Sequence, residues 1–458
     1  MTQPPLYRTL NPADGELVES YPIAADTAIE AALARAAGAF AAWRETPMER
    51  RAAYLRVAAD LLEAGAAAHG ALMAIEMGKP VAQGDAEAKK CAWACRWYAD
   101  NAATLLAAQP RESDGSAAFV RHDPLGPLLA IMPWNFPYWQ FFRFAAPSLM
   151  VGNVVLLKHA PNTPGCALAI EKLMAEAGFP AGVVQNLFLT NEQAARVIAD
   201  ARVRGVTLTG STRAGREVAA VAGRHLKTMV MELGGSDAFI VLADADVDRA
   251  AEVGVTARCL NAGQSCIAAK RFLVERPVFA RFRDAFVDGM RARVQGDPHD
   301  PKTTLGPLAR LDLRDQLASQ VERSVAGGAE AILGGRTPAT PGFFYPATVL
   351  TGARPGTPAA DEELFGPAAS LVSVANEEEA LAVANASSYG LGASLWTADR
   401  ARAERLIPRI DTGSVFVNGL VKSDPRLPFG GVKDSGFGRE LGREGLLEFV
   451  NVKTVWIA

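Results

Sequence analysis

The sequence contains few cysteines and few aromatic residues. Its 458 residues include 7 % aromatics and five cysteines, at positions 91, 95, 166, 259 and 266. A sparse, odd-numbered set of cysteines in a long chain argues against a disulfide framework and favours reduced thiols in the cytoplasm. Cys91 and Cys95 lie one helical turn apart, but no histidine or second cysteine pair accompanies them. We therefore expect no metal site.

The sequence also lacks long hydrophobic runs and an excess of charge of one sign. Its longest apolar runs, such as Leu128–Met132, are far shorter than the roughly 18 residues of a membrane span. The segment Met1–Asp14 has no basic start followed by an apolar core, so no secretory signal is predicted. Lysine and arginine number 47, aspartate and glutamate 50, and the net charge is −3. We expect neither a membrane nor a nucleic-acid partner.

What the sequence does contain is the pattern of a large α/β protein. Residues 26–110 are rich in alanine, with apolar residues at helical spacing, and predict packed helices. From about residue 119, short apolar runs alternate with helical patterns, as in Leu128–Met132 followed by Phe141–Met150. A second series of this kind begins near Met229. The alternation is typical of βαβ units around mostly parallel sheets, and the length predicts two or three domains.

Four short segments carry groups suited to chemistry. They are Pro133-Trp-Asn-Phe-Pro137, Thr209-Gly-Ser211 with the helix after it, Glu232-Leu-Gly-Gly235 and Gly263-Gln-Ser-Cys266. The helix start at Ser211 suits a phosphate, because free N–H groups and the positive dipole end point outward there. Gly210 and Gly215 would let the backbone approach a ligand closely. The three-glycine dinucleotide fingerprint is absent, so a plain turn before a helix remains an alternative.

The other three segments each present one reactive side chain. Cys266 has small or polar neighbours, which fits an accessible, nucleophilic thiol better than a buried and inert one. Glu232 is either a general base whose pKa is tuned by partial burial or a solvated side chain in a turn. Asn135, in a loop that two prolines make rigid, either donates to a developing oxyanion or serves as a turn residue.

These segments occur in one order with Glu363-Leu-Phe-Gly-Pro367 and Pro428-Phe-Gly-Gly431, and in this combination the sequence resembles the aldehyde dehydrogenase superfamily. The resemblance extends from about residue 8 to the end of the chain. It implies a Rossmann-type cofactor domain in residues 1–115 and 129–228 and an α/β catalytic domain in residues 229–421. It also implies an oligomerisation arm with a C-terminal segment, formed by residues 116–128 and 422–458, and a homodimer or homotetramer.

The resemblance implies that an aldehyde is oxidised to the carboxylic acid with NAD or NADP, through a thiohemiacetal and a thioester on the cysteine. Cys266 resembles the nucleophile, Glu232 the general base, and Asn135, together with the backbone N–H of Cys266, the oxyanion donor. The residues that it assigns to the cofactor are Trp134, Lys158, Gly210, Ser211, Gly215, Leu233, Glu363 and Phe365. The alternative of another class is a catalytically retired member that serves as a binding or structural protein. The intact catalytic residues argue against that alternative.

Within the superfamily, the chain is most similar to a bacterial branch of the succinate-semialdehyde dehydrogenases, which implies succinate semialdehyde as the substrate. The similar segments are Leu157-Lys-His-Ala-Pro-Asn162, Ser265-Cys-Ile-Ala-Ala-Lys-Arg271 and Lys422-Ser-Asp-Pro-Arg-Leu-Pro428. Arg143 matches an arginine for the substrate carboxylate, with a structural ion pair as its alternative. A second arginine of some relatives is replaced by Leu260, and Ser423 and Arg426 are weaker candidates to compensate. A broad-range or other semialdehyde dehydrogenase is therefore an alternative.

The segment after Lys158 bears on the choice of cofactor. Many NAD-preferring relatives carry a glutamate three residues after this lysine, where it binds the adenosine 2′-hydroxyl, and here that position is Pro161. A 2′-phosphate would meet no repulsion from a carboxylate there. We therefore predict that NADP is accepted.

Overall fold

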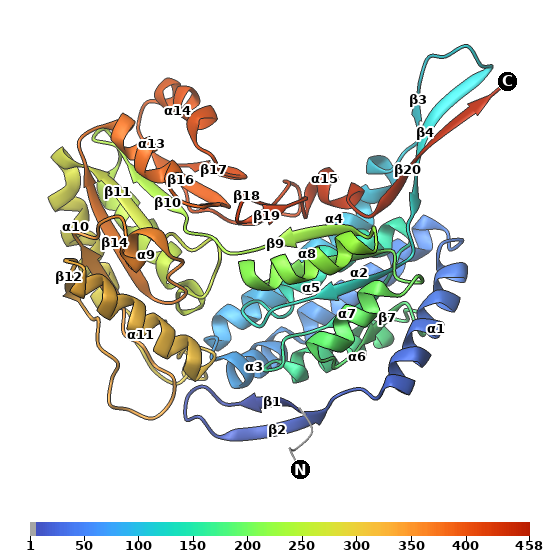
Figure 1. The fold of residues 1–458 in the computed structure, drawn as a ribbon, viewed down its shortest axis with the longest axis horizontal. Helices are drawn as coiled ribbons and strands as arrows, with labels where there is room; N and C mark the ends of the chain where they lie inside the picture. Colours follow the sequence, from blue (N-terminus) through green and yellow to red (C-terminus); the bar gives the residue numbers. More distant parts are fainter. Residues whose placement is uncertain (1–5) are drawn as a thin grey trace.

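The computed structural model describes residues 6–458 and shows two α/β bodies side by side, with a narrow arm that projects from the first of them (Figure 1). Residues 1–5, which the predicted cofactor domain includes, lie outside the described residues. Within the described part, no helix is long and apolar enough to cross a membrane. The α/β class predicted from the alternating apolar and helical segments is confirmed.

The first body is built on a six-stranded sheet with the order β19-β9-β8-β5-β6-β7. All neighbouring strands are parallel except β19, which pairs antiparallel with β9. The interior strands β5, β6 and β8 are buried over nearly their whole length because helices cover both faces of the sheet. The strands are β5 Pro127–Ile131, β6 Val154–Lys158, β7 Val184–Asn186, β8 Gly205–Thr209, β9 Thr228–Glu232 and β19 Gly436–Phe437.

The helices predicted in residues 26–110 are confirmed as α1 to α4, which pack on this body. α3 and α4 approach closely at Gly70 and Gly84, where a Cβ added to Gly84 would lie 2.6 Å from the Gly70 Cα. The helices of the first body are α1 Asp26–Trp43, α2 Met48–Ala64, α3 Ala66–Met77, α4 Val81–Leu105, α5 Trp139–Val151, α6 Pro164–Glu176, α7 Asn191–Ala199, α8 Thr212–Arg224 and α15 Gly442–Leu447.

The second body contains a seven-stranded sheet with the order β12-β13-β14-β11-β10-β16-β17, parallel except for the β12–β13 pair. Its core on one face is aromatic, with Phe239, Phe272, Phe282, Phe286 and Trp396 in contact. The strands are β10 Ala238–Val241, β11 Arg271–Glu275, β12 Glu330–Leu333, β13 Thr348–Thr351, β14 Ala368–Val374, β16 Gly392–Trp396 and β17 Ser414–Val417.

The helices of the second body include one that the sequence analysis missed, α11, which borders the cleft described below. The helices are α9 Val247–Cys259, α10 Arg276–Arg291, α11 Leu311–Ala326, α12 Pro358–Asp361, α13 Glu377–Asn385 and α14 Arg400–Leu406, with 3-10 turns at Leu260–Gly263 and Ile407–Arg409. Two short strands, β15 Tyr389–Gly390 and β18 Val432–Lys433, pair beside the first sheet.

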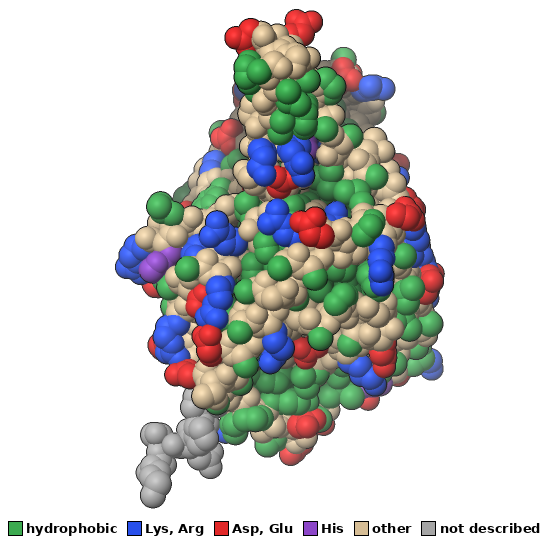
Figure 2. All heavy atoms as spheres, turned by 90° about the vertical axis from the view of Figure 1, so that its right-hand side faces the viewer, with side chains coloured by type: hydrophobic (Ala, Val, Ile, Leu, Met, Phe, Trp, Pro, Cys, Tyr) green, Lys and Arg blue, Asp and Glu red, His purple; other side chains and the backbone are tan. Residues whose placement is uncertain are grey.

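The arm is an antiparallel sheet of β3 Gln109–Pro110, β4 Ala117–Pro124 and β20 Val450–Ile457, in the order β20-β4-β3. A separate hairpin of β1 Leu6–Leu10 and β2 Leu17–Pro22 lies at the opposite end of the first body (Figure 1). Figure 2 looks onto the arm and shows hydrophobic side chains along it.

One predicted domain boundary differs from the observed sheet. β9 belongs to the first sheet, so the first body extends to Glu232 rather than ending at residue 228. Within the predicted C-terminal segment, β20 joins the arm, whereas β19 pairs with β9 and α15 packs against α5 of the first body. The sequence could not show this, since the pairing of a two-residue strand depends on which sheet edge the fold brings to it.

Candidate functional site

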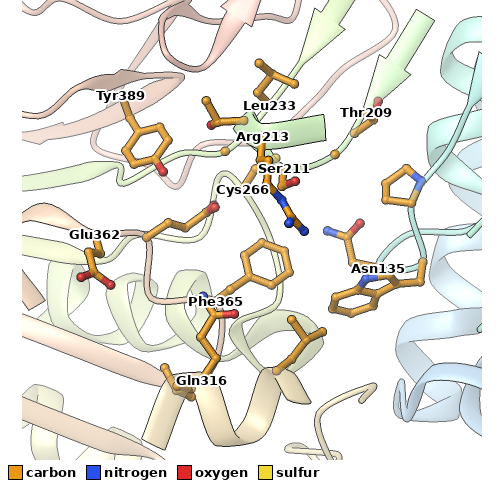
Figure 3. Close-up of a pocket in the computed structure, with 18 of the residues that line it drawn as sticks. Asn135, Thr209, Ser211, Arg213, Leu233, Cys266, Gln316, Glu362, Phe365 and Tyr389 are labelled. Carbon is orange, nitrogen blue, oxygen red and sulfur yellow. The ribbon is translucent and has the colours of Figure 1, made fainter. Parts of the chain in front are cut away.

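A cleft of about 610 Å³ lies between the two bodies (Figure 3). Part of its wall consists of segments that follow three neighbouring parallel strands of the first sheet, namely residues 133–135 after β5, 209–213 after β8 and 233–234 after β9. The carboxyl ends of parallel strands are where open α/β sheets bind ligands. The second body supplies the opposite wall, with Cys266, Glu363, Phe365 and residues of α11. The volume is that of a small-molecule or cofactor site.

The Asn135 side chain is fixed by hydrogen bonds on both sides. Its Nδ2 donates to the backbone oxygen of Gln264 over 3.0 Å, and its Oδ1 accepts from Nε2 of Gln140 over 2.9 Å. The residue is buried, yet it lines the cleft, and Figure 3 shows its amide turned inward. One Nδ2 hydrogen remains to be donated to a group bound beside Cys266. This arrangement suits an oxyanion donor that is oriented before the reaction begins.

The backbone just before Cys266 is held in an unfavourable conformation. Three successive residues, Asn261–Gly263, have positive φ angles of 55°, 52° and 74°. A non-glycine residue in this region costs on the order of 1–3 kcal/mol and needs support from its surroundings. Arg258 and Lys270, both buried, give that support by donating to backbone carbonyls on either side of Cys266. Lys270 Nζ also donates to the carbonyl of Cys266 itself, over 2.9 Å.

The Cys266 thiol is half-buried at the cleft wall. Burial raises its pKa to about 12, and the positive charges of Arg143 and Lys270 oppose this rise. The unliganded protein therefore keeps most of the thiol protonated at neutral pH. The nucleophilic thiolate is a minor species whose fraction grows as pH rises.

The pH dependence of this thiol gives a direct prediction. Alkylation of Cys266 by iodoacetamide should accelerate about tenfold per pH unit between pH 7 and 10, because the thiolate fraction rises tenfold per unit below the pKa. Mass spectrometry of the Cys266 peptide measures the rate. The other four cysteines are buried and serve as internal controls, since they should stay unmodified. A rate that levels off below pH 8 would contradict the raised pKa.

Glu232 ends β9 as a buried carboxylate. Among the described residues, neither of its oxygens has a hydrogen-bond partner. It lies beside Gly430, where an added Cβ would come within 2.8 Å of Glu232 Oε1. Burial raises its pKa well above the usual range, Arg143 lowers it and Glu440 raises it further. Glu232 itself does not border the cleft, although the next residue, Leu233, does. An unpartnered carboxylate with a raised pKa is suited to accept a proton near neutrality.

The loop after β8 has the features of a phosphate site. Ser211 caps α8, with its Oγ accepting from the N–H of Ala214, and residues 209–213 border the cleft. Gly210 is open, since a Cβ there would meet nothing closer than 3.6 Å. A Cβ on Gly215 would lie 2.5 Å from a methyl group of Leu233, so this glycine allows β9 and α8 to approach. The helix start is therefore accessible to an anion.

The remaining predicted cofactor residues lie along the same side of the sheet or across the cleft. Trp134 and Phe365 face each other edge to face, with ring centroids 5.7 Å apart. One carboxylate oxygen of Glu363 accepts from the N–H of Gly235 over 2.9 Å, and the Glu363 side chain borders the cleft. Lys158, at the end of β6, has no carboxylate within 4 Å among the described residues, and burial lowers its pKa to about 8. Lys158 does not border the cleft, whereas the start of α8 and Glu363 do, and a dinucleotide would offer these two a phosphate and a ribose.

The Arg143 guanidinium already has partners within the protein. Its guanidinium forms a buried ion pair with Glu440, donates to Thr209 Oγ1 over 3.1 Å and lies over the ring of Phe429. It does not border the cleft. The ion pair with Glu440 is the structural role given above as the alternative, and the substrate role of Arg143 stays a prediction.

Ser423 and Arg426, the weaker candidates, also lie outside the cleft. Arg426 pairs with Asp424 over 2.6 Å, and 63 % of its side chain is exposed. Its charge is therefore already compensated at the surface. Ser423 is buried, and its Oγ accepts from Nζ of Lys90 over 2.7 Å.

Sequence reasoning missed the pair that supports the Asn135 loop. Lys79 and Glu87 form a fully buried ion pair at the start of α4. Lys79 Nζ donates to the backbone oxygen of Asn135 over 2.9 Å, and Glu87 accepts from the N–H groups of Tyr138 and Trp139 over 3.0 Å each. The available signal was a pair of opposite charges eight residues apart, with Lys79 just before α4 and Glu87 within it.

Comparisons with known proteins agree over the whole chain. A sequence model of the aldehyde dehydrogenase family matches residues 2–455. The probable succinate-semialdehyde dehydrogenase (NADP+) of Synechocystis sp. is 49 % identical over 450 residues, which cover 98 % of this chain and 99 % of that protein. Succinate-semialdehyde dehydrogenase (NADP+) 1 of Mycobacterium tuberculosis is 49 % identical over 453 residues, with the same coverage. The crystal structure of succinic semialdehyde dehydrogenase from Streptococcus pyogenes with NADP+ is 38 % identical, with a TM-score of 0.96 over 98 % of this chain and 99 % of that one. The chain therefore belongs to the aldehyde dehydrogenase family.

Proposed function

We propose that this protein oxidises succinate semialdehyde to succinate with NADP+ as the hydride acceptor. The observation that carries the proposal is the position of the Cys266 thiol in the wall of a dinucleotide-sized cleft that the fixed amide of Asn135 also lines. The choice of substrate and cofactor is supported by the relatives at 49 % identity, whose names state both.

The side chains present account for the chemical steps. The Cys266 thiolate attacks the aldehyde carbon, and Asn135 Nδ2 with the Cys266 N–H stabilises the oxyanion that forms. Bound NADP+ would supply the acceptor for the hydride that leaves this carbon, and loss of the hydride leaves a thioester on Cys266. Glu232 then accepts a proton from the water that attacks the thioester, and the carboxylic acid is released.

The backbone around the nucleophile keeps this geometry while the sulfur changes its bonding. Arg258 and Lys270 bind carbonyl oxygens rather than the thiol, so they hold the loop equally well in the free and acylated states. Asn135 is bonded to the same loop through Gln264. This hydrogen bond links the position of the oxyanion donor to that of the loop that carries the sulfur.

The cofactor preference is testable by initial rates at 340 nm. With succinate semialdehyde, kcat/KM for NADP+ should exceed that for NAD+ by about tenfold or more, because a charge-assisted hydrogen bond from Lys158 to a 2′-phosphate contributes roughly 1.5–3 kcal/mol. The variant Lys158→Met should bring the ratio close to one.

Three results would count against the proposal in different ways. A strong preference for NAD+ would contradict the cofactor. Equal kcat/KM values for succinate semialdehyde and butanal would favour a broad-range aldehyde dehydrogenase. The absence of turnover with any aldehyde would favour a retired member with a binding role.

The proposal includes association with further copies of the chain through the arm. β20 has a free edge, since it pairs only with β4 within the described residues, and free edges invite strand pairing. Val452, Trp456 and Ile457 expose 61 %, 50 % and 49 % of their surface on this strand. Figure 2 shows hydrophobic side chains gathered on the arm. This supports a homodimer or homotetramer.

Lysine substitutions on the arm should dissociate the oligomer. We expect the double variant Val452→Lys/Trp456→Lys to be smaller by light scattering than the unmodified protein, because buried lysines at an interface would lose their hydration. Val294→Lys, at an equally exposed position away from the arm, is the matched control. An unchanged mass for the double variant would reject the arm as the interface.

The cysteines support a cytoplasmic location. All five are free, and four are buried. Cys259 Sγ lies 3.4 Å from Met290 Sδ rather than beside another thiol. A reducing compartment keeps the Cys266 thiol, which the reaction requires, from oxidation.

A further inference from the structure

Lys90 is a cation with an unusual environment outside the cleft. It lies on α4, half-buried, with its Nζ donating to Ser423 Oγ over 2.7 Å. The same Nζ lies 4.1 Å from the centroid of the Trp139 ring. Burial lowers its pKa to about 8. An ammonium in such a place is usually paired with a carboxylate, since desolvation of an unpaired charge is costly.

Among the described residues, no carboxylate lies within 4 Å of the Lys90 ammonium. The acids nearest to it along the chain and in space are already paired. Glu87 is bound by Lys79, Asp85 by Lys89, and Asp424 by Arg426. The contacts that Lys90 does make, a serine hydroxyl and an indole face, are those that leave its positive charge available to an anion.

The position of Lys90 places it near the Asn135 loop without being part of the cofactor cleft. Trp139, whose ring lies under the Lys90 ammonium, is the first residue of α5, the helix that follows the Asn135 loop. Arg143 lies one turn further along α5. Glu87, one turn before Lys90 on α4, accepts from the N–H groups of Tyr138 and Trp139. Lys90 therefore lies where α4 packs against the start of α5, next to the Asn135 loop. The dinucleotide cleft includes no residue of α4.

We infer that Lys90, with the Ser423 hydroxyl, binds the carboxylate of the semialdehyde substrate at the end remote from the aldehyde carbon. The inference rests on the proposed function and names the group that makes it specific. The charge of Arg143 is already paired with Glu440, whereas that of Lys90 has no carboxylate partner among the described residues. A four-carbon chain with its aldehyde on Cys266 would direct its carboxylate along α5 toward Lys90. The Ser423 hydroxyl, which now accepts from Lys90, can turn to donate to the same carboxylate.

The test compares a charged with a neutral aldehyde of equal length. Lys90→Met removes the charge and keeps most of the side-chain volume. We expect kcat/KM for succinate semialdehyde to fall about 30-fold or more, mainly through KM, because the substrate then loses a charge-assisted hydrogen bond. kcat/KM for butanal should change less than twofold. Lys90→Arg should restore most of the activity with the semialdehyde.

Two controls make the outcome decisive. Lys89→Met changes the neighbouring lysine, which is exposed and paired with Asp85, and should leave both aldehydes unaffected. Succinate, as a probe anion, should inhibit butanal oxidation by the unmodified protein more strongly than by Lys90→Met. Equal losses of kcat/KM with both aldehydes would show a structural role for Lys90. Unchanged kcat/KM values with both aldehydes would show that Lys90 has no role. A failure of the proposed function is distinguishable, since the unmodified protein would then show no preference for the semialdehyde.

Discussion

Replacement of Cys266 with serine is expected to lower the rate of aldehyde oxidation by at least about 10⁴-fold, because a hydroxyl is a far weaker nucleophile than a thiolate and no neighbouring histidine activates it. The loop that presents the side chain should be unaffected. Its unfavourable backbone at residues 261–263 is held through carbonyl oxygens by Arg258 and Lys270, and none of these bonds involves the sulfur. Initial rates at 340 nm with saturating succinate semialdehyde and NADP+ measure the loss.

The control for this variant is the binding of the cofactor. The cleft residues on the first body do not contact the Cys266 sulfur through any hydrogen bond, so the dissociation constant for NADP+, measured by calorimetry, should change less than threefold. Undiminished turnover by the serine variant would reject the covalent mechanism. A large loss of cofactor affinity would instead indicate that the substitution had disturbed the cleft.

The second large effect is expected for Glu232→Gln. Steady-state turnover should fall by about 10²–10⁴-fold, since hydrolysis of the thioester loses its general base. The first turnover should persist, so stopped-flow absorbance at 340 nm should show a burst of about one NADPH per active site. Mass spectrometry of the stopped enzyme should then detect the acyl group on the Cys266 peptide.

Folding should tolerate this substitution. Neither Glu232 oxygen has a hydrogen-bond partner among the described residues, so the isosteric amide removes no contact that the carboxylate makes. Burial of the carboxylate raises its pKa well above the usual range, which means that its charged form is destabilised in the folded state. The midpoint of thermal unfolding at pH 8 should therefore be equal to or above that of the unmodified protein. Loss of the burst together with steady-state turnover would place Glu232 in the acylation step instead.

The charges around Glu232 explain how the C-terminal part of the chain belongs to the site. Glu440, which follows β19, pairs with Arg143 of α5, and this pair lies beside Glu232 at the end of β9. Gly430 packs against the same carboxylate. This part of the C-terminal segment therefore packs against Glu232, the proposed general base. Its removal would expose Glu232 and lower the pKa toward the value of a solvated carboxylate.

Local sequence determined the elements and the candidate reactive groups. Sequence patterns predicted the strands β5, β6 and β8 and the alanine-rich helices. Both predictions were possible because burial on two faces and helix propensity depend on neighbouring residues. Ser211 could be predicted as the start of a helix because an N-cap bonds only to the N–H groups of the next few residues. Cys266 and Asn135 stood out through their small or rigid neighbours, and the order of the motifs indicated the family.

Tertiary structure alone decided the partner of each buried charge. Arg143 pairs with Glu440, nearly 300 positions away in the sequence, and Lys90 meets Ser423 across 333 positions. Asn135 is oriented by a carbonyl 129 positions later. Such pairs change the free energy of folding only when both groups are removed from water. Which groups meet depends on how the sheets and helices pack. The chain thus specified by itself which atoms can react, while the packed fold selected which charges remain free to bind a substrate.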